Sequence, residues 1–186
     1  VFCLLLIAQV MAFYEPVQAA KIPFEVPKTG DVIGFDADQP LTGNIQYDVT
    51  WDKNFLGRLR RVSTLKVSLK GPLNTPLKIL VPLEVTVLGK DIRKEETIYG
   101  AHAFSTDLSL PANETKVFNF RYAHPESEKT YSLAVFPQNG NLTYHLSLTP
   151  PGDMQMRAPE WEAKGNRVTW DGAIKNARRF TAQLEK

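Results

Sequence analysis

The titratable side chains of this chain are scattered, and their spacing matches no familiar catalytic arrangement. The histidines His102, His124 and His145 lie far apart, and none has a second metal ligand at short spacing. The segment from His124 to Glu128 is the one local cluster of titratable groups, and as a loop it could supply a base or a ligand. The sequence contains neither a nucleophile elbow nor a phosphate-binding glycine loop. A triad assembled from distant residues stays open, because such partners need not be neighbours in the chain. We expect a non-enzymatic protein with no catalytic residues and no cofactor.

Three aspartates near the start of the chain could bind a hard cation. Asp31, Asp36 and Asp38 lie close together, and calcium is bound by several carboxylate oxygens. The same residues are also typical of solvated turns, in which Asp bonds its own backbone. The spacing of an EF-hand and its closing glutamate are missing, so we expect no metal site.

A basic loop is predicted between Asp52 and Arg61, with its positive charges at Lys53, Arg58, Arg60 and Arg61. Such a loop could contact anionic partners, for example lipid headgroups or acidic polysaccharide. The alternative is an ordinary solvated hairpin loop. Arg58, Arg60 and Arg61 are therefore candidate partner-binding residues.

Trp161 lies in a connector between Pro159 and Gly165. An exposed tryptophan on a β-scaffold can stack on a sugar ring. The alternative is a lid that closes one end of the fold, since large exposed aromatic side chains are unfavourable unless they are used. Trp161 is thus a second candidate for partner contact.

The segment Leu77–Leu88 alternates apolar and polar residues and is predicted to be a strand with Pro82 in its middle. Proline lacks an N–H, so we expect this strand at a sheet edge or beside a bulge. Leu80 and Leu88 are apolar on the face that should be solvated. The edge could accept a protein partner by β-augmentation. Alternatively, a loop of the same chain covers both leucines, and Pro82 prevents aggregation at the edge.

Strands position all of these residues. A period of two runs through Val62–Lys70 and Leu77–Leu88, which are joined by the turn-rich segment 71–76, and it fits strands and not a helix. Asn139-Gly140 is a strong hairpin signal. Further strands are expected at Asn44–Trp51, Thr97–Phe104, Asp107–Leu110, Thr115–Tyr122, Tyr131–Phe136, Leu142–Leu148, Arg167–Trp170 and Ala177–Leu184. Roughly nine or ten short strands with frequent turns predict an antiparallel β-sandwich, Ig-like or jelly-roll-like.

The first residues predict export. An apolar run from Val1 to Phe13 is followed by small residues around Ala19, which is typical of a secretory signal peptide. The run is too short to span a bilayer as a mature helix. Cleavage after Ala19 would leave residues 20–186 as one β-sandwich domain without a membrane span, secreted or periplasmic. The lone cysteine, Cys3, lies in the signal, so the mature domain must be stabilised by its hydrophobic core.

The last quarter of the chain resembles the Ig-like repeat modules of bacterial surface proteins. The resemblance is carried by Pro151-Gly152-Asp153, by Gly165-Asn166-Arg167-Val168-Thr169-Trp170-Asp171-Gly172, and by the alternating segment 177–184. In those modules a Val-Thr-Trp-x-Gly strand precedes a final alternating strand. The resemblance implies a stalk, adhesin or docking module and brings no catalytic residues.

Two classes of function fit these observations. The first is an exported, non-enzymatic β-sandwich that acts as a binding or structural module in the periplasm or on the cell surface, with a protein or an envelope polysaccharide as partner. The second is a lipocalin-like barrel that holds an apolar small molecule. Branched aliphatic residues at inward positions favour a filled core and hence the first class. The net charge of +2 argues against a nucleic-acid partner.

Overall fold

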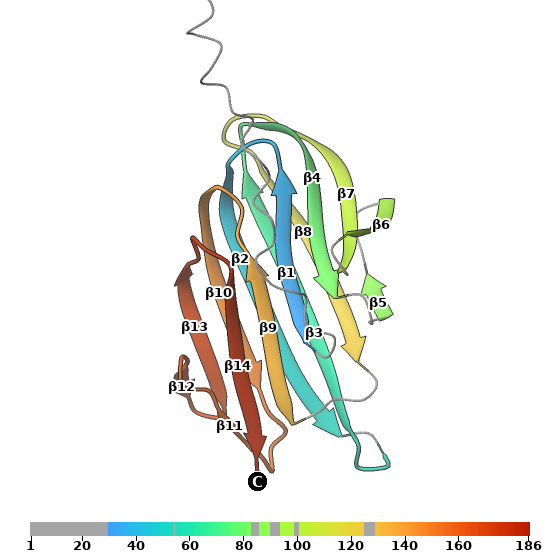
Figure 1. Ribbon diagram of the computed structural model, residues 1–186, viewed down its shortest axis with the longest axis vertical. Coiled ribbons are helices and arrows are strands. Elements are labelled where there is room, and N and C mark those ends of the chain that lie inside the picture. The colour runs from blue at the N-terminus through green and yellow to red at the C-terminus, as the bar shows by residue number, and fades with distance from the viewer. Residues whose placement is uncertain (1–29, 54, 83–85, 90–93, 99–100, 125–128) are drawn as a thin grey trace, which may run out of the picture.

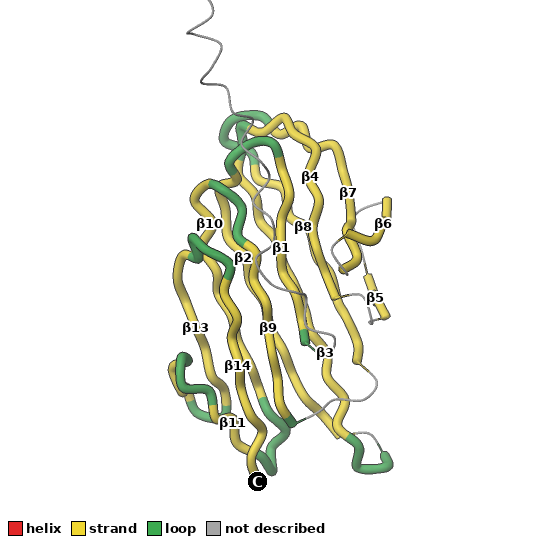
Figure 2. The backbone as a smooth tube through the Cα atoms, viewed as in Figure 1, coloured by secondary structure: helices red, strands yellow, loops and turns green. Residues whose placement is uncertain are grey.

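The computed structural model describes residues 30–53, 55–82, 86–89, 94–98, 101–124 and 129–186 (Figures 1 and 2). Every regular secondary-structure element in these segments is a β-strand, which confirms the predicted all-β class. None of these segments contains a helix long and apolar enough to cross a membrane. The predicted signal peptide lies outside the described residues. The strands are β1 (Asp31–Ala37), β2 (Leu41–Lys53), β3 (Leu59–Lys70), β4 (Leu73–Pro82), β5 (Thr86–Gly89), β6 (Lys94–Ile98), β7 (Ala101–Leu110), β8 (Thr115–His124), β9 (Thr130–Phe136), β10 (Gly140–Thr149), β11 (Gln155–Arg157), β12 (Glu162–Lys164), β13 (Arg167–Ala173) and β14 (Arg178–Glu185).

The strands form two seven-stranded sheets that pack face to face, so the predicted β-sandwich is confirmed (Figure 1). Sheet A has the order β11-β14-β9-β1-β4-β7-β6, and sheet B has the order β12-β13-β10-β2-β3-β8-β5. Neighbouring strands are antiparallel, except for one parallel pair in the middle of each sheet, β1 with β9 and β2 with β10. The parallel pairs arise because β1–β2 and β9–β10 both cross from sheet A to sheet B and lie beside each other.

The predicted hairpin at Asn139-Gly140 is wrong in its pairing, because the chain changes sheet at this turn. Strand β3 belongs to sheet B and β4 to sheet A; β9 and β10 are divided in the same way, as are β13 and β14. The two strands on either side of Asn139-Gly140 therefore do not pair with each other. Side-chain alternation is the same in both cases, since each strand presents one face to the shared core.

The predicted edge position of Leu77–Leu88 is wrong for its first part. Strand β4 lies between β1 and β7 in sheet A, and Pro82 is its last residue. Pairing with β1 has already stopped at Leu80, so the missing proline N–H breaks no bond on that side. The chain then crosses to sheet B, where β5 is the edge strand beside β8.

One apolar cluster fills the space between the sheets. As predicted, Leu65, Val67 and Leu69 of β3 point inward, and they meet Leu77, Ile79 and Val81 of β4. The described strands form two separate sheets with this packed middle, and they do not close into a lipocalin-like barrel. A smaller apolar cluster lies on the opposite face of sheet A and contains Val32, Leu80, Ala101, Ala103, Ala134 and Phe136.

Candidate functional site

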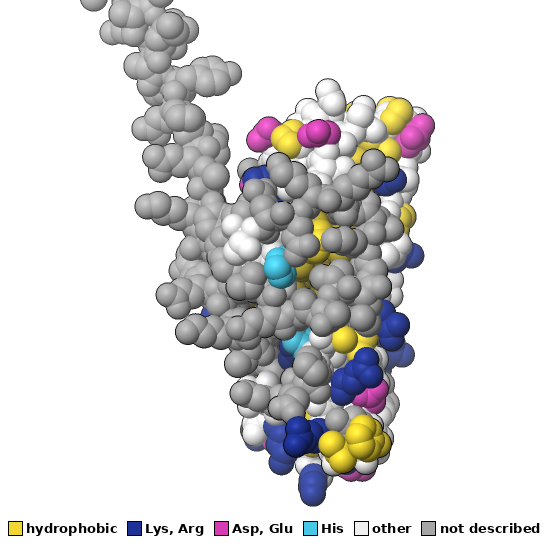
Figure 3. Space-filling model, turned by 90° about the vertical axis from the view of Figure 1, so that its right-hand side faces the viewer, with side chains coloured by type: hydrophobic (Ala, Val, Ile, Leu, Met, Phe, Trp, Pro, Cys, Tyr) yellow, Lys and Arg dark blue, Asp and Glu magenta, His cyan; other side chains and the backbone are white. Residues whose placement is uncertain are grey.

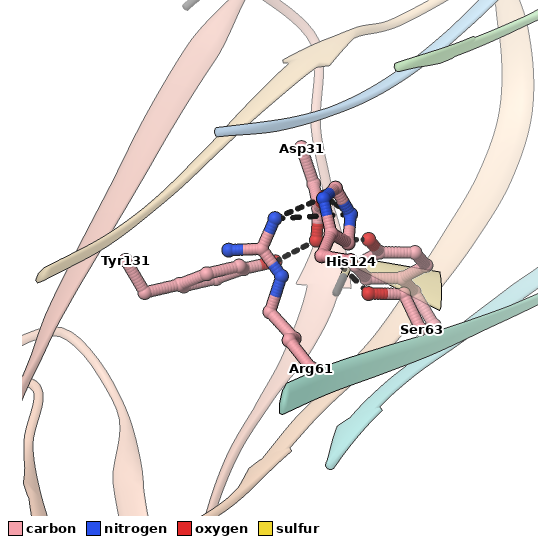
Figure 4. Close-up of polar contacts among 6 residues, drawn as sticks. Asp31, Arg61, Ser63, His124 and Tyr131 are labelled. Carbon is pink, nitrogen blue, oxygen red and sulfur yellow. Dashed lines mark hydrogen bonds and ion pairs between the residues drawn. The ribbon is translucent and has the colours of Figure 1, made fainter. Parts of the chain in front are cut away.

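A buried carboxylate lies inside the sandwich, among side chains from both sheets. Asp31, the first residue of β1, has no exposed surface. Its Oδ2 accepts hydrogen bonds from Tyr47 Oη at 2.5 Å, Ser63 Oγ at 3.1 Å and Tyr131 Oη at 3.2 Å. Its Oδ1 lies 3.0 Å from Arg61 Nη2. Figure 4 shows the side chains of Arg61, Ser63 and Tyr131 turned toward the carboxylate. We call Asp31, Tyr47, Arg61, Ser63, His124 and Tyr131 the buried charge cluster.

The cluster joins the two sheets. Asp31 and Tyr131 come from β1 and β9 in sheet A, whereas Arg61 and Ser63 come from β3 in sheet B. Arg61 and Ser63 have the same parity as Leu65, so the strand pleat turns both of them toward the interior. Five polar groups therefore surround one carboxylate where the sandwich is otherwise apolar.

His124, the last residue of β8, completes the cluster. Its Nε2 lies 3.0 Å from Asp31 Oδ1 and also 3.0 Å from Arg61 Nη2 (Figure 4). A single ring nitrogen cannot serve both neighbours, because it either donates a proton to the carboxylate or accepts one from the guanidinium. Which of the two contacts His124 makes depends on the tautomer of its ring. Residues 125–128, the rest of the predicted loop cluster, lie outside the described residues.

The electrostatics keep the carboxylate ionised. Burial alone would raise the pKa of Asp31, but the charge of Arg61 and the hydrogen bonds from His124 and Tyr47 lower this pKa to about 2. Burial and the negative charge of Asp31 raise the pKa of Tyr47 and of Tyr131, so both phenols stay protonated and donate. A carboxylate with so low a pKa is a weak general base at neutral pH. The geometry therefore suits a structural ion pair better than proton transfer.

Tyr131 connects the cluster to the end of the β2–β3 hairpin. The Arg61 guanidinium lies over its ring, 5.2 Å from the centroid. The Trp51 ring meets it edge-on, with centroids 5.4 Å apart. Trp51 and Arg61 are direct partners in the β2–β3 register. Both sides of the hairpin are thus held on one aromatic ring.

Two polar atoms near the carboxylate, Arg61 Nε and Tyr122 Oη, have no hydrogen-bond partner among the described residues. The Tyr122 side chain is fully buried, and burial together with the charge of Asp31 raises its pKa. Its hydroxyl group is therefore a desolvated donor that contributes no bond to the cluster.

The structure buries four of the predicted partner-binding residues: Arg61, Leu80, Trp161 and Pro82. Arg61 belongs to the buried charge cluster and not to the basic loop, because β3 begins at Leu59. Leu80 is buried in the apolar cluster on the opposite face of sheet A. Trp161 is 8% exposed and packs edge-on against Phe180 at 5.5 Å, which agrees with the lid interpretation.

Two of the remaining candidates are exposed at the surface. Arg58 and Arg60 are exposed at the β2–β3 connection, which is shorter than predicted because β2 extends to Lys53. Pro82 is buried at the end of β4. Leu88 lies in the edge strand β5, and its side chain is outside the described residues.

The aspartates and histidines considered as possible metal ligands do not lie together. Asp31 points into the core, while Asp36 and Asp38 are exposed, so the three carboxylates do not converge on a cation. No group of three potential metal ligands occurs among the described residues. His145 Nδ1 contacts Asp171 Oδ1 on the surface, away from His124.

Sequence reasoning missed Asp31, Tyr47, Ser63 and Tyr131 as members of a site. A signal was nevertheless present, because Arg61 and Ser63 fall on the inward parity of β3 together with Leu65. A charged residue at an inward position requires a buried partner of opposite charge. The sequence alone could not identify that partner, because Asp31 is distant in the chain and lies in the other sheet.

No family model matches this sequence, and no curated protein matches it. Among solved structures, the chain is similar to a "putative nutrient binding protein" from Legionella pneumophila subsp. pneumophila str. Philadelphia 1, with a TM-score of 0.51 and 10% sequence identity. The match covers 85% of this chain and 72% of the Legionella chain. An M1 zinc metallopeptidase from Deinococcus radiodurans matches with a TM-score of 0.46 and 10% identity, over 79% of this chain and 43% of that chain. At these identities the Legionella match shows a shared fold.

Proposed function

We propose that this protein is an exported, non-enzymatic β-sandwich that acts as a binding or structural module in the periplasm or on the cell surface. The buried charge cluster carries the proposal. Its carboxylate is fully buried, surrounded by five polar groups and ionised at neutral pH. It therefore serves as one half of an ion pair that joins the two sheets. The surface of a rigid scaffold is then what remains for function.

Two resemblances support a binding function. The Legionella protein of similar fold is described as nutrient binding, and the same class of activity would suit this chain. The C-terminal segment 151–184 resembles Ig-like repeat modules, which implies a stalk, adhesin or docking module. We propose a protein or an envelope polysaccharide as the partner.

Export is tested by expressing the full chain in a bacterial host and separating periplasm, membranes and cytosol. Mass spectrometry of the exported protein should give a chain that begins at Ala20. Protease treatment of intact cells then distinguishes the cell surface from the periplasm. An intact N-terminus in the cytosolic fraction, or a lipid adduct on Cys3, would contradict the proposal.

The proposed absence of enzymatic activity is tested separately. The purified protein is assayed against panels of peptide, ester, glycoside and phosphate-ester substrates, with Asp31→Asn and Ser63→Ala as reference variants. We expect equal background rates for all three proteins. A turnover that disappears in Asp31→Asn, while circular dichroism shows an intact fold, would identify the cluster as catalytic and overturn the proposal.

A further inference from the structure

The connection between β2 and β3 exposes two large apolar side chains in succession. Phe55 is 94% exposed and Leu56 is 63% exposed, and they are the exposed large hydrophobic residues of the described chain. Single exposed apolar residues are common, but an aromatic and an aliphatic side chain together at a protruding tip indicate a contact surface. We call residues 52–53 and 55–60 the hairpin tip.

The hairpin tip extends beyond the strands that flank it. Pairing of β2 with β10 ends at Thr50, and pairing of β3 with β8 begins at Arg61. The β2–β3 ladder itself continues to Lys53 and Leu59. Figure 1 shows this connection at one end of the sandwich. A two-stranded ribbon therefore projects from sheet B and carries Phe55 and Leu56 at its turn.

The base of the ribbon is fixed. Trp51 and Arg61 face each other across β2 and β3, and both pack on the ring of Tyr131. Arg61 is further held by Asp31 at 3.0 Å. The buried charge cluster thus holds the ribbon in one orientation and reduces the entropy lost when the tip docks.

Positive charge accompanies the apolar tip. Lys53, Arg58 and Arg60 are exposed there with one acidic residue, Asp52, which gives a formal charge of 3 − 1 = +2 for the hairpin tip. Lys53 forms an ion pair with Asp153. Figure 3 shows hydrophobic side chains at the lower end of the molecule, bordered by Lys and Arg.

We propose that the hairpin tip docks on the surface of an anionic lipid bilayer. Phe55 and Leu56 enter the boundary between headgroups and acyl chains, while Arg58 and Arg60 remain at the level of the lipid phosphates. Positive charge near a negative membrane surface strengthens such binding. An acidic polysaccharide would match the arginines but offers no apolar phase to Phe55 and Leu56, so the lipid surface is favoured. The proposal goes beyond the proposed function and does not depend on it.

The test uses purified protein whose N-terminus has been determined, mixed with vesicles of equal parts phosphatidylglycerol and phosphatidylcholine, and with vesicles of phosphatidylcholine alone. Co-sedimentation should show binding to the anionic vesicles. The double variant F55S/L56S should weaken that binding at least about ten-fold, because two apolar side chains lose their burial. R58Q/R60Q should weaken it by roughly ten-fold or more on anionic vesicles only.

Matched controls separate the tip from general charge. K66Q/R121Q removes two exposed positive charges from strands β3 and β8 outside the tip, and it should leave binding unchanged. Any contribution of the N-terminal residues is common to all variants and cancels. Phe55→Trp adds an exposed fluorophore to a chain in which Trp51 and Trp161 are buried, and its emission should shift to shorter wavelength on anionic vesicles.

Three results would overturn the proposal. The first is an unchanged Phe55→Trp emission in saturating anionic vesicles. The second is equal loss of binding in K66Q/R121Q and R58Q/R60Q. The third is binding to an acidic polysaccharide such as heparin that R58Q/R60Q weakens and F55S/L56S does not, together with no vesicle binding, which would assign the tip to polysaccharide.

Discussion

The Asp31 carboxylate of β1 and the Arg61 guanidinium of β3 lie 3.0 Å apart and join the two sheets through the buried interior. Their side chains are 0% and 4% exposed, so the pair has almost no help from solvent. Breaking such a pair leaves an uncompensated charge in an apolar medium, whereas removing both charges does not.

Removing one charge of the pair should cost more stability than removing both. Asp31→Asn leaves Arg61 buried without its counter-ion and should lower the free energy of unfolding by about 3–5 kcal/mol. The double variant D31N/R61M should recover part of that loss, since no charge remains. Urea unfolding of D31N, R61M and D31N/R61M gives the change in the free energy of unfolding for all three variants. Asp153→Asn, which breaks the exposed ion pair with Lys53, is the control and should leave the midpoint unchanged. A double variant that is as unstable as the sum of its single variants would contradict the coupling.

Acid should destabilise the protein through Asp31. The folded pKa of about 2 lies below the unfolded value of 3.8, so the unfolded state takes up this proton first as the pH falls. The stabilisation is therefore complete above pH 4 and is lost between about pH 4 and pH 2, with a magnitude of about 2 kcal/mol. Urea midpoints measured across this range should fall steeply for the natural protein. Asp31→Asn should show a shallower fall, and parallel curves for the two proteins would contradict the assignment.

The free energy of unfolding should respond differently to loss of the hydroxyl group at two buried tyrosines. Tyr47 Oη donates to Asp31, so Tyr47→Phe removes a hydrogen bond to a charged group and should cost about 1.5–3 kcal/mol. Tyr122 Oη is buried and has no hydrogen-bond partner within the described part of the chain, so Tyr122→Phe should be neutral or slightly stabilising. Thermal and urea unfolding of this matched pair check both values. Equal losses would show that Tyr122 has a role in the cluster that its present contacts do not provide.

Gly140 should be indispensable where the β1–β2 and β9–β10 turns meet. Its φ is +127°, and a Cβ atom there would lie 2.0 Å from the Leu41 carbonyl oxygen. The Leu41 N–H also donates to Asn139 O at 2.8 Å, so the two turns are locked together. Gly140→Ala should lower the free energy of unfolding by at least about 2 kcal/mol. Gly152→Ala, where a Cβ atom meets nothing within 4 Å, is the control. A small effect at Gly140 would show that the two turns can separate without loss.

Much of the fold was readable in the sequence because side-chain alternation is a local property. The inward faces of Leu65, Val67 and Leu69 and of Phe118, Phe120 and Tyr122 follow from a period of two, and the structure confirms both. The buried lid position of Trp161 was likewise one of the two interpretations that its surroundings allowed.

The pairing of strands was not readable, because a strand facing the core looks the same in either sheet. Asn139-Gly140 was interpreted as a hairpin turn, yet it joins β9 of sheet A to β10 of sheet B. Pro82 was placed at an edge because its missing N–H excludes a paired position, but ending the strand satisfies the same constraint.

The alternating strands, the residues that face a core and the apolar run before Ala19 can all be predicted from local sequence. The contact between Asp31 and Arg61, the exposure of Phe55 and Leu56, and the crossing between sheets at Asn139-Gly140 depend on the tertiary fold. The difference lies in the range of the interactions. Alternation depends on neighbouring residues, whereas an ion pair between two sheets depends on chain segments that only folding brings together.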